Sequence, residues 1–269
     1  MKPEYMRLCK TAESSEEAIA RLIDLFEILR VECPWDRVQT HETLKTCLIE
    51  ETYEVIDAID KKDTANLREE LGDVLLQVVF HASLKAEEKQ IDLCDVINEE
   101  CEKMIRRHPH VFSEESIKSI DKVLEKWENI KGCETGKKDY TSKMTKIPKA
   151  LPALMRANKV QKKAADVGFD WDDVGPAFDK INEETAELRE AHKNMDQASI
   201  NEELGDLLFS VVNVARFLSV DPEEALNFTT NKFIERFAYI EREALACGKR
   251  LEDMSLREMD ELWEQAKHK

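Results

Sequence analysis

Eight acidic residues recur in this sequence at one spacing, and carboxylates are the side chains that bind hard divalent cations. The first set is Glu51, Glu54, Glu70 and Asp73, and the second set is Glu184, Glu187, Glu203 and Asp206. Each member of the second set follows its counterpart by 133 residues. Because four acids keep one spacing in two copies, we interpret each set as a cluster that holds metal ions.

The spacing within each set predicts two facing helices. Glu51 and Glu54 stand three residues apart, as do Glu70 and Asp73, so each pair shares one helical face. The axes of packed helices lie about 8–10 Å apart, so acids on facing helices can meet. Bare carboxylates at that distance repel each other, and one or more takes up a proton unless a cation intervenes. Oxygen ligands alone favour Mg²⁺, with Mn²⁺ possible, over Zn²⁺.

The rest of the chain predicts an all-α protein. Only 7 Gly and 7 Pro occur in 269 residues, and 36% of the residues are charged. The apolar run 74–80 could form a strand, but its length and helix-forming flanks favour a buried central helix, and residues 202–218 predict a second one. Other helices are expected at 18–30, from Thr40 through Glu54, from Asp92 to His108, at 113–131, at 154–163, from Pro176, from Asp221 and from Ser255.

The repeat indicates two tandem helical-bundle lobes, each with a carboxylate metal site between two helices. We expect an N-terminal lobe at 1–131, a linker at 132–150, where the sequence is polar and rich in Lys, and a C-terminal lobe at 151–269. The glycines of Glu70-Leu71-Gly72-Asp73 and its copy cost helix stability, so we expect them to permit close helix approach. His81, on the central helix, is expected to be a hydrogen-bonded core residue.

Basic and aromatic residues repeat as well. Lys103 and Arg107 precede Lys232 and Arg236 by 129 residues, and Trp127 and Lys131 precede Trp263 and Lys267 by 136. Lys and Arg can neutralise phosphate charge, and a Trp one helical turn from a Lys offers a base a flat face. Ordinary charged helix faces explain these pairs equally well, so the pattern alone does not decide.

Composition excludes several classes of protein. A net charge of −17 argues against a general nucleic-acid binder. Seven cysteines without a Cys-x-x-Cys pair favour reduced thiols in a cytoplasmic protein over a zinc site. We expect neither a signal peptide nor a membrane span, because no apolar run is long enough. The stretch 132–138 lacks the spacing and the Ser/Thr of a phosphate-binding loop.

Taken together, these motifs resemble a known family. They are Cys33-Pro34-Trp35-Asp36, Gln39-Thr40-His41, the two acid sets, Arg107-His108-Pro109-His110-Val111-Phe112 and Gly168-Phe169-Asp170-Trp171. They are similar to those of MazG, the tandem all-α nucleoside triphosphate pyrophosphohydrolases, over nearly the whole chain. The resemblance implies Mg²⁺-dependent hydrolysis of (d)NTPs to monophosphate and pyrophosphate by a homodimer. It implies that the eight acids are metal ligands, and that Lys180, Lys232, Arg236, Trp263 and Lys267 contact the nucleotide.

The two lobes differ at one position. Lys180 lies one turn before Glu184, whereas the repeat places Cys47 at the matching point, where the family leads us to expect an aromatic residue. The resemblance therefore favours the C-terminal lobe as the main catalyst, with Glu184 and Glu187 as catalytic metal ligands. We expect Glu183 to orient or deprotonate the attacking water.

Two other functions compete with this one. A carboxylate-bridged di-iron bundle requires Glu-x-x-His on two helices, and neither acid set contains it. A nucleotide-sensing or partner-binding helical module with degenerate catalytic sites is the alternative function. The intact second acid set counts against that alternative, while the altered first lobe allows it in part.

Overall fold

The computed structural model describes residues 2–113, 117, 119–134 and 139–268, and the chain divides into two compact units, residues 1–134 and 135–269. We call them the N-terminal and the C-terminal lobe. The described residues contain helices and no strand, which confirms the predicted all-α class. The division falls inside the predicted linker 132–150.

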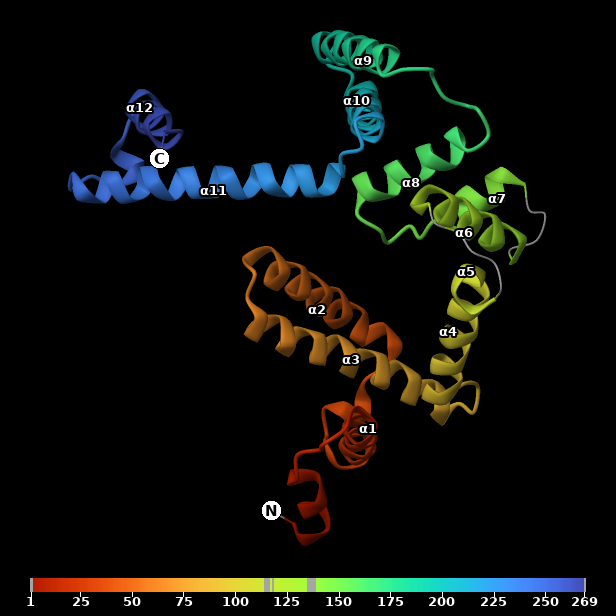
Figure 1. Ribbon diagram of the computed structural model, residues 1–269. Coiled ribbons are helices and arrows are strands. Elements are labelled where there is room, and N and C mark those ends of the chain that lie inside the picture. The colour runs from red at the N-terminus through yellow and green to blue at the C-terminus, as the bar shows by residue number, and fades with distance from the viewer. Residues whose placement is uncertain (1, 114–116, 118, 135–138, 269) are drawn as a thin grey trace. The chain divides into compact units, whose positions relative to one another are not determined.

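The elements follow one another as Figure 1 labels them. The N-terminal lobe contains η1 (Pro3–Cys9), α1 (Ser15–Glu32), η2 (Asp36–Val38), α2 (His41–Lys61), α3 (Thr64–Glu87), α4 (Leu93–Arg107), α5 (Pro109–Phe112) and α6 (Ile120–Glu134). The C-terminal lobe contains α7 (Tyr140–Thr145), α8 (Ala153–Ala165), α9 (Gly175–Lys193), α10 (Gln197–Phe217), α11 (Pro222–Ala246), η3 (Leu251–Asp253) and α12 (Leu256–Ala266).

Side-chain caps mark the start of three of the four acid-bearing helices, namely α2, α3 and α10. The Thr40 hydroxyl accepts from the Thr43 backbone N–H at 3.3 Å, and the Thr43 hydroxyl accepts from the Thr40 N–H at 2.9 Å. Asp63 accepts from two backbone N–H groups at the start of α3, and Asp196 does the same at the start of α10. These caps satisfy donors that a helix leaves unpaired, so the register of the acids is set locally.

In each lobe, two long helices form an antiparallel pair. In the N-terminal lobe α2 packs along α3, and α1 packs against α3 from another side (Figure 1). The core joins Phe26 of α1, Leu44 of α2, and Val79 and Phe80 of α3, with the rings of Phe26 and Phe80 4.4 Å apart. In the C-terminal lobe α9 pairs with α10, α8 packs on α10 and α11, and α12 packs on α11.

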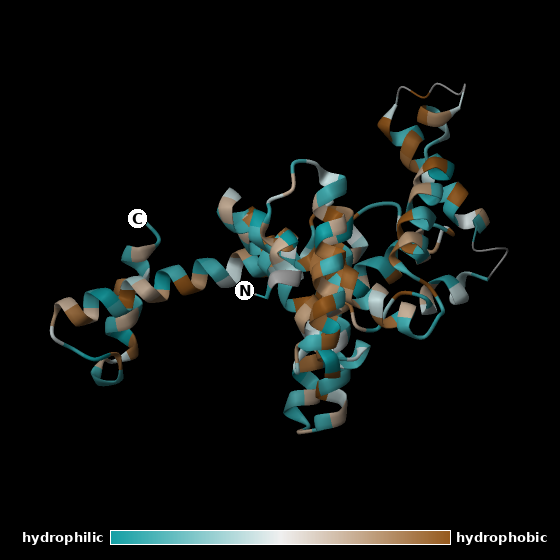
Figure 2. Ribbon diagram, turned by 90° about the horizontal axis from the view of Figure 1, so that it is seen from below, coloured by the Kyte–Doolittle hydropathy of each residue, from teal (hydrophilic) through white to brown (hydrophobic). Residues whose placement is uncertain are grey.

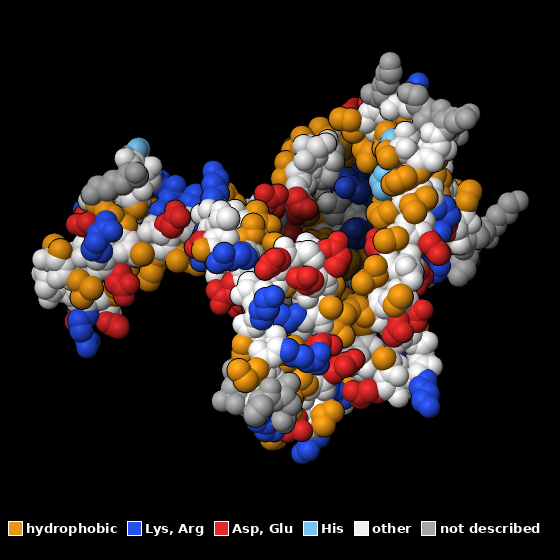
Figure 3. Space-filling view, turned by 60° about the horizontal axis from the view of Figure 1, so that its bottom comes forward, with side chains coloured by type: hydrophobic (Ala, Val, Ile, Leu, Met, Phe, Trp, Pro, Cys, Tyr) orange, Lys and Arg blue, Asp and Glu red, His pale blue; other side chains and the backbone are white. Residues whose placement is uncertain are grey.

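The two helices predicted to be buried, α3 and α10, are buried over only part of their surface. In α3, Leu75 and Val78 are exposed, and in α10, Leu204 and Leu208 are exposed. Figure 2 shows hydrophobic and hydrophilic residues on the same helices, and Figure 3 shows hydrophobic side chains open on the surface. Each central helix has neighbours on only part of its circumference within one chain, which leaves an apolar face uncovered.

The expected role of the two helix glycines was wrong within one chain. A Cβ added at Gly72 or at Gly205 would meet nothing within 4 Å. Neither glycine therefore lies where α2 approaches α3 or α9 approaches α10.

Helix boundaries between the lobes differ from those predicted. The helix expected at 113–131 is α6, which begins at Ile120, and the separate turn α5 precedes it because Pro109 starts a new helix after His108. Helix α7 lies within the predicted linker. Residues 135–138 of the rejected phosphate-loop stretch lie outside the described residues.

Phe26→Ala is expected to destabilise the N-terminal lobe by about 3–5 kcal/mol, because it leaves a cavity beside Phe80. Urea unfolding of the full chain, followed by circular dichroism, measures this change. Phe112→Ala is the control, since Phe112 is exposed in the same lobe and its truncation should change stability by about 0.5 kcal/mol or less. Equal losses in both variants would contradict this assignment of the core.

Candidate metal centre

The first acid set meets between α2 and α3. Carboxylate oxygens of Glu51, Glu54 and Glu70 all lie within 4.8 Å of one another. The fourth acid, Asp73, lies close enough for its charge to raise the pKa of Glu51. The antiparallel packing of α2 on α3 thus brings together residues up to 22 positions apart in the chain.

Burial and crowding raise the pKa values of two acids of this cluster, Glu51 and Glu70. Glu70 is only 8% exposed, and loss of hydration, followed by the charge of Glu54, raises its pKa above the usual value. Loss of hydration and the charge of Asp73 likewise raise the pKa of Glu51. No Lys or Arg among the described residues forms an ion pair with these acids, so the cluster lacks a counter-charge of its own.

The second acid set meets between α9 and α10 around one buried residue. Glu184 is 3% exposed and belongs to two groups of carboxylates whose oxygens lie within 4.8 Å of one another. One group adds Glu183 and Glu187, and the other adds Glu203 and Asp206. Loss of hydration and the charges of Glu187 and Glu184 raise the pKa of Glu203. Glu184 therefore lies at the centre of the C-terminal cluster, where the two groups of carboxylates meet.

Lys180 supplies a counter-charge to the C-terminal cluster. Its ammonium donates to Glu183 Oε1 at 2.9 Å and forms an ion pair with Glu184 Oε1. These hydrogen bonds, first to Glu184 and then to Glu183, raise the pKa of Lys180. Cys47, its counterpart in the N-terminal lobe, is a free, half-buried thiol. At this matched position the C-terminal lobe therefore has a positive charge and the N-terminal lobe has a thiol, as the sequence indicated.

Apart from Lys180 on α9, the predicted nucleotide contacts of the C-terminal lobe lie on α11, on α12 and, for Lys267, directly after α12. The guanidinium of Arg236 lies over the Trp263 ring at 5.5 Å, and Lys232 lies over the Phe228 ring at 5.6 Å. Lys267 pairs with Glu264 on its own helix. Figure 1 shows α11 running away from the α9–α10 pair, with α12 folded back on its far half. Within one chain, these residues therefore form a group of their own, apart from the acids.

The sequence motif at 168–171 anchors a loop to α10, which spacing alone did not reveal. Asp170 Oδ1 accepts from Arg216 Nη2 at 2.5 Å and from the Trp171 backbone N–H at 3.0 Å. Arg216 is nearly buried, so its pairing with Asp170 fixes the loop that leads into α9. Asp170 belongs to a motif that carries the family resemblance, but the sequence does not indicate that it pairs with Arg216.

A second feature that sequence reasoning missed is Glu134, at the end of α6. Its carboxylate accepts from Arg106 Nε at 2.6 Å and from Arg107 Nη2 at 2.5 Å. Those bonds, Arg107 first, lower its pKa to about 2. The sequence offered no signal for this pairing, because no repeated motif links Glu134 to the two arginines.

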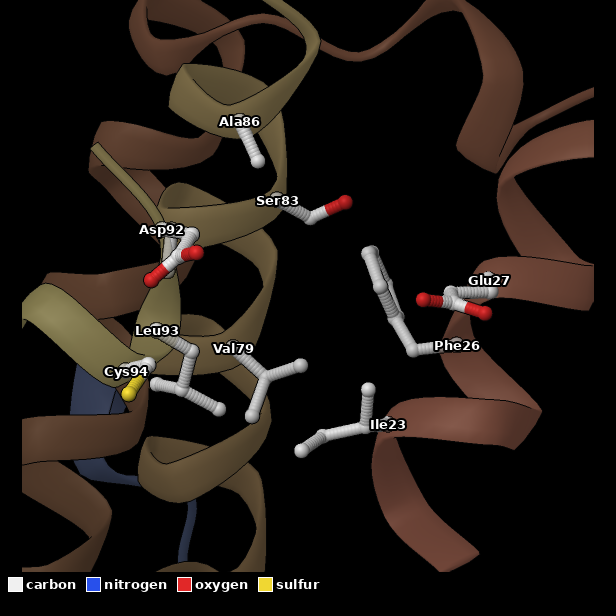
Figure 4. A pocket seen from close by; sticks show the side chains of 10 residues that line it. Ile23, Phe26, Glu27, Val79, Ser83, Ala86, Asp92, Leu93 and Cys94 are labelled. Atoms are coloured by element: carbon white, nitrogen blue, oxygen red, sulfur yellow. The ribbon is translucent and has the colours of Figure 1, made fainter. Parts of the chain in front are cut away.

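A mainly apolar pocket lies between α1, α3 and the start of α4 in the N-terminal lobe. Figure 4 shows Ile23 and Phe26 of α1 facing Val79 of α3, with Leu93 at the start of α4. The pocket has a volume of about 240 Å³ and is lined mostly by apolar atoms. It has no basic side chain among its lining residues, so it does not suit a phosphate ligand.

Comparison with known proteins places the chain in a family. The family model described as "MazG nucleotide pyrophosphohydrolase domain" matches residues 39–112 and 177–240, so each match contains one pair of acid-bearing helices. The chain belongs to the MazG family. Both matched MazG segments begin close to the first acid-bearing helix of their lobe and include all four of its acids.

Two full-length MazG relatives are similar along almost the entire chain. "Nucleoside triphosphate pyrophosphohydrolase/pyrophosphatase MazG" of Thermotoga maritima is 48% identical, over 91% of this chain and 94% of that protein. "Nucleoside triphosphate pyrophosphohydrolase" of Escherichia coli K12 is 45% identical, over 93% and 97%. A crystal structure titled as a mazG-related protein from Thermotoga maritima is 36% identical over 42% of this chain and 97% of that one, with a TM-score of 0.38.

The side chains present fit a hard divalent cation. Both clusters consist only of carboxylates, and loss of hydration raises the pKa of Glu70 in one cluster and of Glu203 in the other. A dication bound there removes the repulsion that raises those pKa values. The acids of both clusters would hold the ion.

Raised pKa values make metal-free stability depend on pH. The folded chain binds protons at Glu51, Glu70 and Glu203 more tightly than the unfolded chain. This contribution to stability is present below the ordinary glutamate pKa and is lost as pH rises through the raised values.

We therefore expect Mg²⁺ to raise the melting temperature more at about pH 8 than at about pH 5, because protons compete for the same oxygens. Differential scanning fluorimetry across that range, with and without Mg²⁺, measures the effect. Glu70→Gln and Glu203→Gln together should reduce the Mg²⁺ effect, while their exposed neighbours Glu69 and Glu202, changed in the same way, serve as controls. A Mg²⁺ effect independent of pH would count against the metal sites.

Proposed function

We propose that this MazG family chain hydrolyses nucleoside triphosphates to monophosphates and pyrophosphate with Mg²⁺ or Mn²⁺. The observation that carries the proposal is the buried Glu184, which joins two carboxylate groups between α9 and α10. The names and near-complete alignment of the two relatives support this reaction over other phosphate chemistry. We expect the protein to be a homodimer in the cytoplasm and not to act on nucleic acid.

The reaction breaks the bond between the α-phosphorus and the oxygen that bridges it to the β-phosphorus. A water oxygen bonds to the α-phosphorus, its proton passes to a base, and pyrophosphate leaves with the electrons of the broken bond. A bound divalent cation supplies positive charge to the phosphate oxygens and lowers the pKa of the attacking water. We assign its binding in the C-terminal lobe to Glu184, Glu187, Glu203 and Asp206.

Glu183 and Lys180 act together beside these ligands. The Glu183 carboxylate lies at the edge of the cluster, more than half exposed, where it can orient a water and receive its proton. Lys180 holds Glu183 and Glu184 in place in the absence of substrate. When a dication satisfies those acids, the Lys180 ammonium is released to reach a phosphate oxygen.

The α11–α12 group completes the site by binding the nucleotide. Lys232 and Arg236 carry positive charge that no carboxylate among the described residues neutralises by an ion pair. We assign them to the phosphate chain, together with Lys267, and Trp263 to the base. Because α11 leads these residues away from α9 and α10, the acids of one chain meet the basic group of its partner in a homodimer.

Exposed apolar side chains support this dimer. Within the C-terminal lobe, α10 exposes Leu204, Leu208 and Phe209, and α11 exposes Phe233 and Ile234. Faces of this kind on two adjacent helices are typical of interfaces between helical subunits. Gly205 lies between the exposed leucines, where a second chain could approach closely.

Glu187→Gln should reduce turnover by about 100-fold or more, because it removes a charge from the cluster and leaves the fold intact. Ion chromatography of the phosphates released from each NTP with Mg²⁺ measures both rate and product. Glu190→Gln, one turn further along α9, is the control, because the Glu190 carboxylate pairs with the exposed Lys193 and accepts from Asn194 Nδ2. Release of orthophosphate instead of pyrophosphate by the unaltered chain would overturn the proposed reaction, and full turnover by Glu187→Gln would move the main site elsewhere.

Two inactive variants should restore activity when mixed. One chain carries Glu187→Gln, and the other carries Lys232→Ala with Arg236→Ala. Random exchange makes half of the dimers mixed, and each has one site with intact acids and an intact basic group, so activity returns to about one quarter of the wild-type value. Co-expression with two affinity tags, followed by the turnover assay, tests this. Mixed dimers without activity would show that each chain builds its site alone.

A further inference from the structure

The N-terminal lobe repeats the guanidinium–indole arrangement of the C-terminal lobe. The Arg107 guanidinium lies over the Trp127 ring at 5.5 Å, the distance that separates Arg236 from the Trp263 ring. The two arginines also match in the sequence repeat. The edge of His108 packs on Trp127 at 4.7 Å, which holds the indole in place. The N-terminal lobe thus retains the part of the site that we assign to nucleotide phosphates.

The two arrangements differ in what neutralises the arginine. In the N-terminal lobe, Glu134 Oε2 accepts from Arg107 Nη2 at 2.5 Å and from Arg107 Nε at 3.1 Å, while Oε1 accepts from Arg106 Nε at 2.6 Å. In the C-terminal lobe, Arg236 contacts the Trp263 ring and has no ion-pair partner in the part of the chain that the structure describes. One carboxylate therefore receives three hydrogen bonds from the two arginines of the N-terminal lobe.

We infer that Arg106, Arg107 and Trp127 form a second phosphate-binding site, which the carboxylate of Glu134 fills and keeps closed. The choice of a phosphate chain as the ligand rests on the proposed function. The site goes beyond that function because the binding it predicts needs neither metal nor turnover.

The geometry suits a phosphate group. A guanidinium binds carboxylate and phosphate oxygens in the same forked manner, so the Glu134 carboxylate occupies the place that two phosphate oxygens would take. A phosphate group brings a further oxygen and more charge to the pair of arginines. The side chain of Arg106 is 53% exposed, which leaves donors open toward solvent for that additional oxygen.

Glu134 can leave without disturbing the core. It is the last residue of α6, its side chain is 21% exposed, and it is not part of the buried cluster around Phe26. Its lowered pKa of about 2 keeps the carboxylate charged at neutral pH. Competition by a more highly charged ligand, and not protonation, is therefore what opens the site.

The test compares anion binding by full-length variants in the absence of divalent cations, where the acid clusters repel phosphate. All variants carry Lys232→Ala and Arg236→Ala, which remove the basic group of the C-terminal lobe. Glu134→Gln is added to open the proposed site. The matched control is Glu128→Gln, which removes the same charge from the same helix, where Glu128 lies 3.5 Å from Lys131.

Isothermal titration with inorganic tripolyphosphate is expected to show one site per chain in the Glu134→Gln variant. Its affinity should be about tenfold or more above that of the Glu128→Gln control, because the competing carboxylate is gone. Adding Arg107→Ala should abolish this binding. A second arm with a non-hydrolysable nucleoside triphosphate identifies the source of the phosphate: tighter binding than tripolyphosphate assigns a nucleotide, and equal binding assigns the phosphate chain alone.

Equal affinities of the Glu134→Gln and Glu128→Gln variants would overturn the inference, as would binding that survives Arg107→Ala. Circular dichroism confirms that each variant is folded, and Glu134→Ala provides an independent opening of the same site with the same expected gain. Failure of the turnover assays would overturn the proposed reaction and leave this binding result unaffected.

Discussion

The mutual repulsion of buried carboxylates is the constraint on which the rest of this structure depends. Packing α9 on α10 buries Glu184 among other acids, and packing α2 on α3 buries Glu70 in the same way. Such burial disfavours the charged form and is costly unless a cation or a proton is present. A bound dication would therefore stabilise the folded chain. The raised pKa values of Glu70 and Glu203 reflect the same repulsion between carboxylates.

The lobes meet this demand differently, and the difference bears on function. In the C-terminal lobe Lys180 supplies a movable counter-charge, while Arg236 has no carboxylate partner among the described residues. In the N-terminal lobe the acids have no such lysine, and Glu134 pairs with the arginines instead. Both lobes thus contain an acid cluster and an arginine beside a tryptophan. In the C-terminal lobe a lysine pairs with the acids, and in the N-terminal lobe a glutamate pairs with the arginines, which is consistent with a catalytic lobe and a lobe with a closed binding site.

Much of the fold could be predicted because its signals are local. The caps at Thr40 and Asp63 and the spacing of Glu51 and Glu54 act within one or two helical turns, and the structure confirms the helices that they predict. The uncovered faces of Leu75 and Leu208 could not be predicted, because an apolar residue does not reveal whether its own chain covers it. Pairings across unrepeated segments, such as Asp170 with Arg216 and Glu134 with Arg107, likewise depend on tertiary placement.

The most direct test of the central claim is a crystal structure of the full chain with Mn²⁺, recorded so that the anomalous scattering of manganese is measured. The account predicts anomalous peaks between α2 and α3 and between α9 and α10, each within coordination distance of the converging carboxylates. Side chains turned toward solvent, with no manganese peak at either helix pair, would contradict it.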